Sequence, residues 1–236
     1  MVSMSELQAV FWDMDGTLVD TEPYWIESQY RLVTEHGGTW DEEKAHHLVG
    51  QALTYSASVL QDAGVQMGVR EIIDHLTAQV VNRCAERIPW RPGARDLLQE
   101  LHRERVRSAM VTMSFTPLAR AIADALPTGQ LEFVVTGDMV SAGKPDPEAY
   151  HLAFDTMAAN HEVRTGAPLR RQKCLAIEDS VPGTAAAAAS GLVTVAVPHY
   201  SPLPATGQWH LLETLAGTGL ADLQELLVRE PSPAVA

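Results

Sequence analysis

Short apolar runs alternate with helix-like segments along most of this chain, and the alternation restricts the folds that it can adopt. The runs that read as strands span residues 7–12, 106–112, 133–135, 174–177 and 192–197. The segments that read as helices between or after them span residues 94–104, 117–126, 147–158 and 183–190. Strands separated by helices pair as parallel neighbours, because each crossover helix packs back onto the sheet. The sequence therefore predicts an α/β fold with a parallel sheet covered by helices on both faces.

One long segment, from about residue 22 to residue 87, departs from this alternation because no strand pattern interrupts its helix-like stretches. Glycines divide it into three or four predicted helices, at positions 37–38, 50 and 64. The sequence PWRPG at residues 89–93 then breaks the pattern and is typical of a hinge. We therefore expect a small all-helical domain inserted after the first strand. The expected boundaries are residues 20–89 for the insert and residues 1–19 with 90–236 for the core.

Acidic residues are in excess, with 30 Asp and Glu against 17 Lys and Arg among 236 residues and a net charge of −13. A strongly negative surface repels nucleic acid and anionic membranes, so neither is expected as a partner. A small anionic substrate would need a local positive charge at its site. A monomer is the default expectation for the assembly state.

The two cysteines, Cys84 and Cys174, lie far apart and form no metal-binding or disulfide pattern. We expect both to be reduced thiols, as in a cytosolic protein. The N-terminal sequence MVSMSELQ lacks a basic stretch followed by a long apolar one, so no signal peptide is expected. The apolar runs fall short of the roughly 18 residues that cross a bilayer. The cytoplasm is therefore the expected location.

The strongest chemical signal is the sequence DMDGT at residues 13–17, directly after the first apolar run. Ligands of open parallel sheets bind beyond the carboxyl ends of the strands, so the Asp13 carboxylate is directed at the binding crevice. Asp15 would point to the opposite face of an extended chain, but Gly16 permits a sharp turn that can return it over Asp13. One acid could then act as nucleophile and the other as general acid. The alternative is that both acids only shape a turn.

A calcium loop of the EF-hand type is a rival interpretation of this segment. Such a loop has glycine at its sixth position and glutamate at its twelfth. Counting from Asp13, glycine falls at the fourth position and the twelfth residue is Tyr24. The EF-hand interpretation is therefore excluded.

Two further candidate sites follow predicted strands. Thr112 and Met113 end the second apolar run, where a hydroxyl and free backbone N–H groups can hold a phosphate oxygen. A helix cap for the segment that starts near Pro117 is the alternative. Lys144 lies between Gly143 and Pro145, where a lysine has little freedom and can deliver a fixed positive charge, unless it is an ordinary solvated lysine.

The adjacent acids Glu178 and Asp179 follow the strand pattern at 174–177 and precede a helix. Their carboxylates are the hard oxygen ligands that Mg²⁺ prefers, although acids in this position also cap helices. All four motifs fall at the carboxyl ends of predicted parallel strands. We therefore expect them to meet at one edge of the sheet.

These residues, in this order, resemble the four motifs of the haloacid dehalogenase superfamily: Asp13 and Asp15, Thr112, Lys144, and the pair Glu178 and Asp179. The match extends over FWD at 11–13, GKPDP at 143–147, EDS at 178–180, Gly183 and the segment 186–191. It covers nearly the whole chain and is similar to the beta-phosphoglucomutase-like subgroup, with its sugar-phosphate phosphatases. The resemblance implies a Rossmann-like core, a mobile helical cap after the first motif, and one bound Mg²⁺ ion.

The resemblance also implies a role for each motif residue. Asp13 attacks phosphorus and forms an aspartyl-phosphate, while Asp15 is the general acid and then the general base. Lys144 and Thr112, with the backbone N–H of Met113, stabilise the transferring phosphoryl group. The implied Mg²⁺ ligands are the Asp13 carboxylate, the Asp15 backbone carbonyl and Asp179, with Glu178 in the first coordination shell or just outside it.

Departures from the family patterns narrow the reaction. Haloacid dehalogenases proper do not need the second aspartate, so Asp15 favours phosphoryl transfer. Phosphonatases use a lysine of the cap to form a Schiff base. Here the lysine of the predicted insert, Lys44, lies next to Glu42 and Glu43, which argues against that role. Beta-phosphoglucomutases carry a histidine where this chain has Trp25, and a cap-loop arginine where it reads GQAL at 50–53. We therefore expect a Mg²⁺-dependent phosphatase for small metabolites, such as sugar or polyol phosphates, with a beta-phosphoglucomutase-type transferase as the alternative.

By motif position, Trp25 and Gln51 are candidate substrate-facing residues, although Trp25 could equally be a core residue of the helical insert. The segment 159–173 reads as a solvated loop. A non-enzyme alternative is a receiver-like regulatory domain, which would also use a strand-end aspartate, Mg²⁺ and a lysine.

Overall fold

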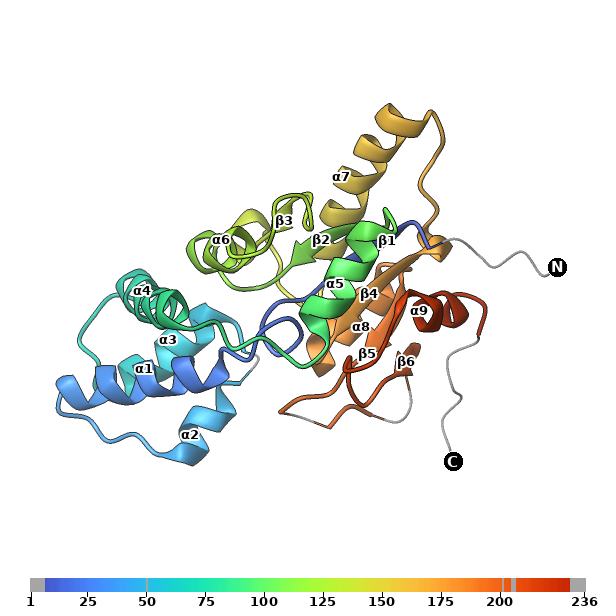
Figure 1. The fold of residues 1–236 in the computed structure, drawn as a ribbon. Coiled ribbons are helices and arrows are strands. Elements are labelled where there is room, and N and C mark those ends of the chain that lie inside the picture. Colours follow the sequence, from blue (N-terminus) through green and yellow to red (C-terminus); the bar gives the residue numbers. More distant parts are fainter. Residues whose placement is uncertain (1–6, 50, 201, 205–206, 230–236) are drawn as a thin grey trace.

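The computed structural model describes residues 7–49, 51–200, 202–204 and 207–229 (Figure 1). Its centre is a six-stranded sheet in the order β3-β2-β1-β4-β5-β6, in which every neighbouring pair is parallel. The strands are β1 (Ala9–Trp12), β2 (Arg107–Val111), β3 (Val134–Val135), β4 (Cys174–Glu178), β5 (Val193–Ala196) and β6 (Trp209–Leu211). The predicted parallel α/β sheet is therefore confirmed, and β6 is an addition to it.

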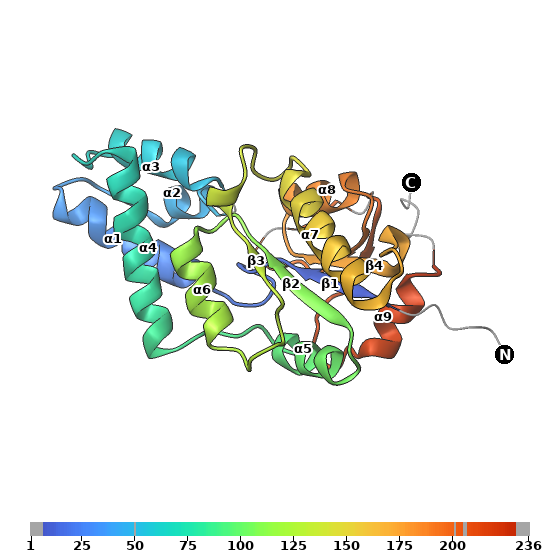
Figure 2. The same cartoon turned by 90° about the horizontal axis from the view of Figure 1, so that it is seen from above.

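Helices cover both faces of the sheet (Figures 1 and 2). Because side chains alternate along a strand, Val10 and Trp12 of β1 pack into one apolar cluster, and Ala9 and Phe11 into another. The first cluster includes residues of α5 (Ala94–Arg103), α6 (Thr116–Asp124) and α9 (Leu220–Leu226). The second includes residues of α7 (Glu148–Thr165) and α8 (Val181–Ala189). The central strands are thus buried on both sides, as their continuous apolar runs predict.

The predicted insert consists of helices. Its elements are α1 (Glu22–Glu35), α2 (Glu42–His47), α3 (Leu53–Asp62) and α4 (Val69–Glu86). They lie together at one end of the molecule, and α4 runs beside α6 of the sheet-containing part (Figure 2). The predicted break at Gly50 lies outside the described residues.

Two chain segments connect the helices α1–α4 to the rest of the molecule, and they pair with each other. Asp20 N–H donates to the Pro89 carbonyl at 2.8 Å, and Arg91 N–H donates to the Leu18 carbonyl at 2.9 Å. Val19 and Trp90 form an antiparallel bridge between these two bonds. The predicted domain boundaries near residues 20 and 89 fall on this double connection, and the division into two domains stays a prediction.

The segment predicted as a loop at 159–173 is helical over its first half, so that prediction was wrong there. Helix α7 continues to Thr165 and ends at Gly166, whose φ of +70° allows its N–H to bond the Glu162 carbonyl at 2.8 Å. Beyond Met157 the helix buries no further apolar side chain, which is why the apolar pattern ends early. Arg164 nevertheless holds this exposed extension to Glu132, with Nη1 to Oε1 at 3.0 Å. Short 3₁₀ turns occur at Gly137–Met139 and Arg171–Lys173.

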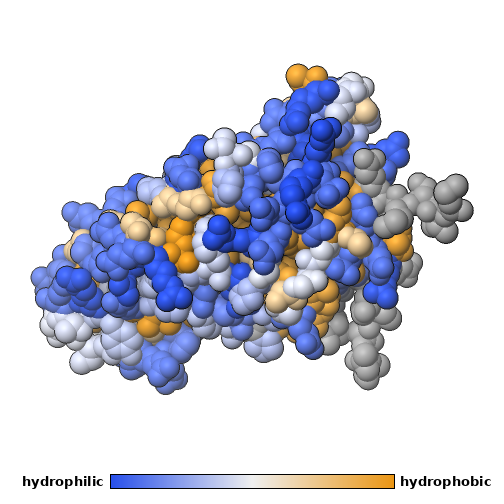
Figure 3. Space-filling view, viewed as in Figure 1, coloured by the Kyte–Doolittle hydropathy of each residue, from blue (hydrophilic) through white to orange (hydrophobic). Residues whose placement is uncertain are grey.

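Several composition-based expectations can be compared with the structure. Both Cys84 and Cys174 are buried and free. Among the described residues, no helix combines the length and the apolar character that crossing a bilayer requires. On the face drawn in Figure 3, hydrophilic residues predominate, and apolar residues form small separate patches.

Candidate active site

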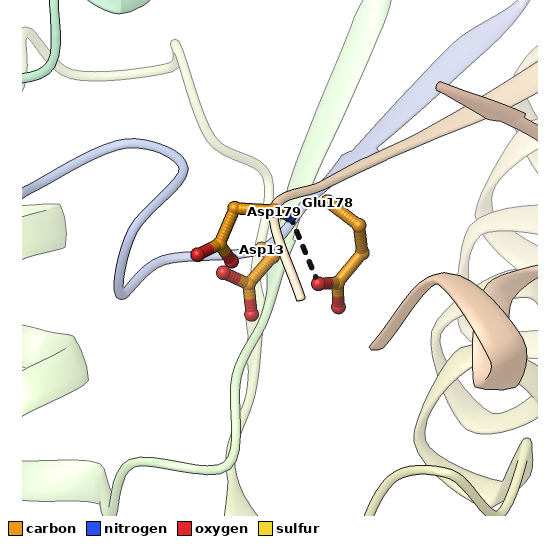
Figure 4. A group of neighbouring side chains, drawn as sticks. All are labelled: Asp13, Glu178 and Asp179. Atoms are coloured by element: carbon orange, nitrogen blue, oxygen red, sulfur yellow. Dashed lines mark hydrogen bonds between the residues drawn. The ribbon is translucent and has the colours of Figure 1, made fainter. Parts of the chain in front are cut away.

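Three carboxylates meet at the carboxyl edge of β1 and β4 (Figure 4). Trp12 of β1 pairs in register with Ile177 of β4, so the next residues, Asp13 and Glu178, lie side by side. One carboxylate oxygen each of Asp13, Glu178 and Asp179 lies within 4.8 Å of the others, and all three residues are buried. The strand-end acids singled out from the sequence therefore converge as predicted.

Lys144 neutralises part of this charge from the loop that precedes α7. Its Nζ donates to Asp13 Oδ1 at 2.7 Å, to Glu178 Oε1 at 2.6 Å and to the Val111 carbonyl at 2.9 Å. An ammonium group has three N–H donors, so all of them are used. Burial would lower the pKa of Lys144, but the two neighbouring carboxylates raise it above its usual value. The lysine is thus a fixed positive charge, and not a solvated loop residue.

Asp13 retains one oxygen without a partner. Its Oδ2 is buried and accepts no hydrogen bond from the described residues. Burial and the nearby Glu178 carboxylate raise the pKa of Asp13 to about 7, although Lys144 opposes this shift. Burial, Asp13 and Glu178 likewise raise the pKa of Asp179 well above its usual value. An unpaired buried oxygen among acidic oxygen donors fits a small divalent cation such as Mg²⁺.

A glycine turn brings the loop after β1 against Asp179. Gly16 has a φ of +88°, and a β-carbon there would lie 2.0 Å from Asp179 Oδ2. Thr17 Oγ1 donates to Asp179 Oδ1 at 3.4 Å. The sharp turn predicted at Gly16 is therefore present, and only glycine fits it.

Asp15 faces hydroxyl groups. Its Oδ2 accepts from Ser114 Oγ at 2.7 Å and from Thr112 Oγ1 at 3.3 Å, and its Oδ1 accepts from Thr21 Oγ1. Asp15 thus joins the loop after β1 to the end of β2 and to the residue before α1. Sequence reasoning placed Thr112 at this edge but did not select Ser114 or Thr21, whose only signal is a hydroxyl close to a strand or helix end.

Glu178 is surrounded by hydrogen-bond donors. Besides Lys144, its Oε1 accepts from Tyr150 Oη at 2.8 Å, and its Oε2 accepts from Ser180 Oγ and Asp179 N–H, both at 3.3 Å. The helix α8 approaches so closely that a β-carbon on Gly183 would lie 1.9 Å from Oε2. Because both carboxylate oxygens of Glu178 accept hydrogen bonds, the carboxylate is fixed in an orientation that faces Lys144.

Two functional candidates were absent from the sequence analysis. Tyr150 looks like a core residue of an apolar helix face, and its hydroxyl contact with Glu178 is visible only in three dimensions. Glu22, at the start of α1, is partly buried beside Asp15 and Asp20, and burial together with these two acids raises its pKa to about 8. Its position at the expected start of the helical insert was the only available signal.

The remaining predicted site residues lie in varied surroundings. Thr112 Oγ1 also accepts from Ser114 N–H at 3.0 Å, so it caps the following turn as well as contacting Asp15. Met113 Sδ accepts from Lys144 N–H at 3.3 Å. Trp25 is 7% exposed and packs in the main apolar cluster, as its core alternative predicts. Gln51 is exposed in the loop between α2 and α3, and its substrate-facing role stays a prediction.

Several known proteins are similar to this chain in sequence and fold. A curated relative from Thermotoga maritima, a phosphorylated carbohydrates phosphatase, is 28% identical over 79% of this chain and 82% of its own length. The structure of CbbY from Rhodobacter sphaeroides in complex with phosphate has a TM-score of 0.79 and 27% identity, and the match covers 92% of this chain and 99% of CbbY. A beta-phosphoglucomutase from Clostridium difficile shares the fold, with a TM-score of 0.71, 17% identity and coverage of 94% and 97%.

The sequence model of the haloacid dehalogenase-like hydrolases matches residues 7–191, which include all four predicted motifs. The predicted family and the beta-phosphoglucomutase-like fold are therefore confirmed. With the phosphatase relative, this match also confirms the predicted enzyme class. The chain belongs to the haloacid dehalogenase-like hydrolase family and is a phosphoric monoester hydrolase.

Proposed function

We propose that this protein is a Mg²⁺-dependent phosphatase that hydrolyses small phosphorylated metabolites, in particular sugar or polyol phosphates, through an aspartyl-phosphate on Asp13. The observation that carries the proposal is the buried carboxylate of Asp13, with Lys144 on one oxygen and no partner on the other among the described residues. The substrate class is supported by the Thermotoga maritima relative, which is a phosphorylated carbohydrates phosphatase.

Mg²⁺ would be held by the Asp13 carboxylate, the Asp15 backbone carbonyl and Asp179. Bound there, it would supply positive charge that reduces the repulsion between the Asp13 carboxylate and the substrate phosphate. Glu178 fits better as the partner of Lys144 than as a direct ligand, because both of its oxygens already accept hydrogen bonds from the protein.

In the first step an Asp13 oxygen bonds to phosphorus while the bond from phosphorus to the leaving oxygen breaks. Asp15, protonated at this point, transfers its proton to the leaving alkoxide. Lys144 stabilises the charge on the transferring phosphoryl group, and Thr112 with the Met113 N–H lies at the same edge of the sheet. The helices α1–α4 act as a cap that excludes water during this step.

In the second step a water molecule attacks the phosphorus atom of the aspartyl-phosphate. Asp15 takes a proton from that water, and the bond between Asp13 and phosphorus breaks. Inorganic phosphate leaves, and both aspartates return to their starting states. The balance requires only the ester and water.

The test is a phosphate-release assay on a panel of sugar, polyol and other small phosphate monoesters, with Mg²⁺ or with EDTA. We expect Mg²⁺-dependent release from sugar or polyol phosphates and none from the Asp13→Asn variant. Release that is unaffected by EDTA and by Asp13→Asn would contradict the proposal. A requirement for a hexose bisphosphate would favour the mutase, and a stable phosphoryl label without turnover would favour the receiver-like domain. The predicted cytoplasmic location and monomeric state are not tested by this assay and stay predictions.

A further inference from the structure

Lys144 and Tyr150 share one acceptor, the Oε1 atom of Glu178. Lys144 Nζ lies 2.6 Å from this oxygen and Tyr150 Oη lies 2.8 Å from it. Because the other two N–H groups of Lys144 go to Asp13 and Val111, the position of the Glu178 carboxylate helps to fix where the ammonium lies. A group that fixes Glu178 therefore also fixes the contact between Lys144 and Asp13.

Tyr150 is well placed to do this. It is fully buried on α7, and its ring centroid lies 5.1 Å from Lys144 Nζ. Helix α7 packs against β2, β3 and α8, so the ring is carried by a helix that lies on the sheet. Burial and the Glu178 charge raise the pKa of Tyr150 well above its usual value, so its hydroxyl remains a donor.

The Glu178 carboxylate is also limited on its other side. Gly183 leaves no room there, and the two donors to Oε2, Ser180 Oγ and Asp179 N–H, are both at the long distance of 3.3 Å. Among the described residues, Tyr150 donates the shortest hydrogen bond to the Glu178 carboxylate apart from that of Lys144. If its hydroxyl were removed, the remaining donors would restrain the carboxylate less tightly.

We propose that Tyr150 is a positioning residue: its hydroxyl holds the Glu178 carboxylate in the orientation that directs Lys144 at Asp13. This inference rests on the proposed phosphatase function and adds a residue to it. Tyr150 does not touch the reacting atoms, so its effect must pass through Glu178. That requirement makes the proposal testable by a double-mutant cycle.

The cycle uses Tyr150→Phe, Glu178→Gln and the double variant, assayed with p-nitrophenyl phosphate and Mg²⁺. Since hydrogen bonds to charged groups are among the stronger ones, we expect Tyr150→Phe to lower kcat about tenfold, with KM changed less than about twofold. In the Glu178→Gln background the same change should cost less than about twofold. Thr156→Val is the matched control, because it removes another α7 hydroxyl, which donates to the Leu152 carbonyl at 2.8 Å. It should leave kcat unchanged.

A second cycle measures urea unfolding of the same four proteins in EDTA and does not depend on activity. We expect Tyr150→Phe and Glu178→Gln to be non-additive there too, because the two side chains are in direct contact. If the wild-type enzyme is active but the effects are additive in both cycles, the proposed role of Tyr150 is wrong while the proposed function stands. An equal loss of kcat in Thr156→Val would have the same meaning. A wild-type protein that releases no phosphate from any ester would instead overturn the proposed function, and the inference with it.

Discussion

Gly16 lies so close to the Asp179 carboxylate that a β-carbon on residue 16 would sit 2.0 Å from Oδ2. The loop that carries Asp13 and Asp15 is thereby packed directly on the acid contributed from the end of β4. The close approach joins two of the proposed metal-binding segments, and it depends on the absence of a side chain.

Gly16→Ala should therefore damage both folding and activity. The positive φ alone costs an L-residue about 1–2 kcal/mol, and displacement of Asp179 should lower Mg²⁺-dependent turnover about tenfold or more. Gly166→Ala is the control, because its φ is also positive, at +70°, but a β-carbon there meets nothing within 4 Å. Urea unfolding and phosphate release check both variants. Equal activity in the two variants would show that the close approach of Gly16 to Asp179 is not needed for turnover.

The metal-free protein should lose stability as the pH rises from about 4 to about 7. The pKa of Asp13 is 3.8 as a reference value and about 7 in the folded state, so the folded protein holds a proton that the unfolded chain releases in this window. The raised pKa of Asp179 acts in the same direction. We expect the free energy of unfolding to fall on the order of 4 kcal/mol, since each unit of pKa shift is worth about 1.4 kcal/mol. Mg²⁺ should reduce this slope, because it favours the ionised carboxylates.

Glu22 provides an internal control for the pH effect. Its pKa is also raised, to about 8, so it adds a loss of stability between about pH 4.5 and 8. Glu22→Gln should remove that part of the slope and leave the Mg²⁺-sensitive part in place. Urea unfolding at several pH values, with EDTA or Mg²⁺, separates the two contributions. Stability that is flat or rises with pH in EDTA would contradict the burial of these acids.

Lys144→Met should destabilise the protein much more than a surface lysine replacement. It leaves Asp13 and Glu178 buried without their cation, and breaking a buried pair in this way costs about 3–5 kcal/mol. Lys44→Met is the control, because Lys44 pairs with Asp41 at the surface, where the side chains are 49% and 56% exposed, and such pairs contribute less than about 1 kcal/mol. Similar unfolding midpoints for the two variants would show that the buried contacts are unimportant.

Asp15→Asn should slow hydrolysis of alkyl phosphates by about 10²–10⁴, because the leaving alkoxide then lacks a proton donor. The loss should be smaller for p-nitrophenyl phosphate, since p-nitrophenolate leaves without protonation. Asp138→Asn serves as the control, because Asp138 also accepts hydroxyl hydrogen bonds, from Thr116 and Thr136, outside the acidic cluster. An equal loss on both kinds of ester would contradict the role of Asp15 as proton donor to the leaving alkoxide.

Much of the site could be predicted because its residues occupy special positions in the sequence. Asp13, Lys144 and Glu178 each follow a clear apolar run or stand in a rigid loop, and parallel strands bring such positions to one edge. The same reasoning predicts β1 and β4, whose residues are mostly apolar because both faces are buried, and β2, whose apolar run is interrupted by Arg107 and Ser108.

The parts that sequence reasoning missed depend on contacts between distant segments. Tyr150 reaches Glu178 across 28 positions of sequence, and nothing local distinguishes it from a core tyrosine. The last turns of α7 bury no apolar face, so no periodicity marks them. The three-residue strand β6 is too short to show an alternating pattern and exists because β5 offers it an edge.

In the proposed reaction, Asp13 carries the phosphoryl group between the two steps. This role is tested most directly by rapid acid quenching of the enzyme during turnover with Mg²⁺ and a hydrolysed ester, followed by peptide mass spectrometry. We expect a phosphoryl adduct on the peptide that contains Asp13, located on the Asp13 side chain itself. The Asp13→Asn variant should carry no such adduct. Full turnover by Asp13→Asn, or a phosphoryl adduct on a different residue of the wild-type enzyme, would contradict this role of Asp13.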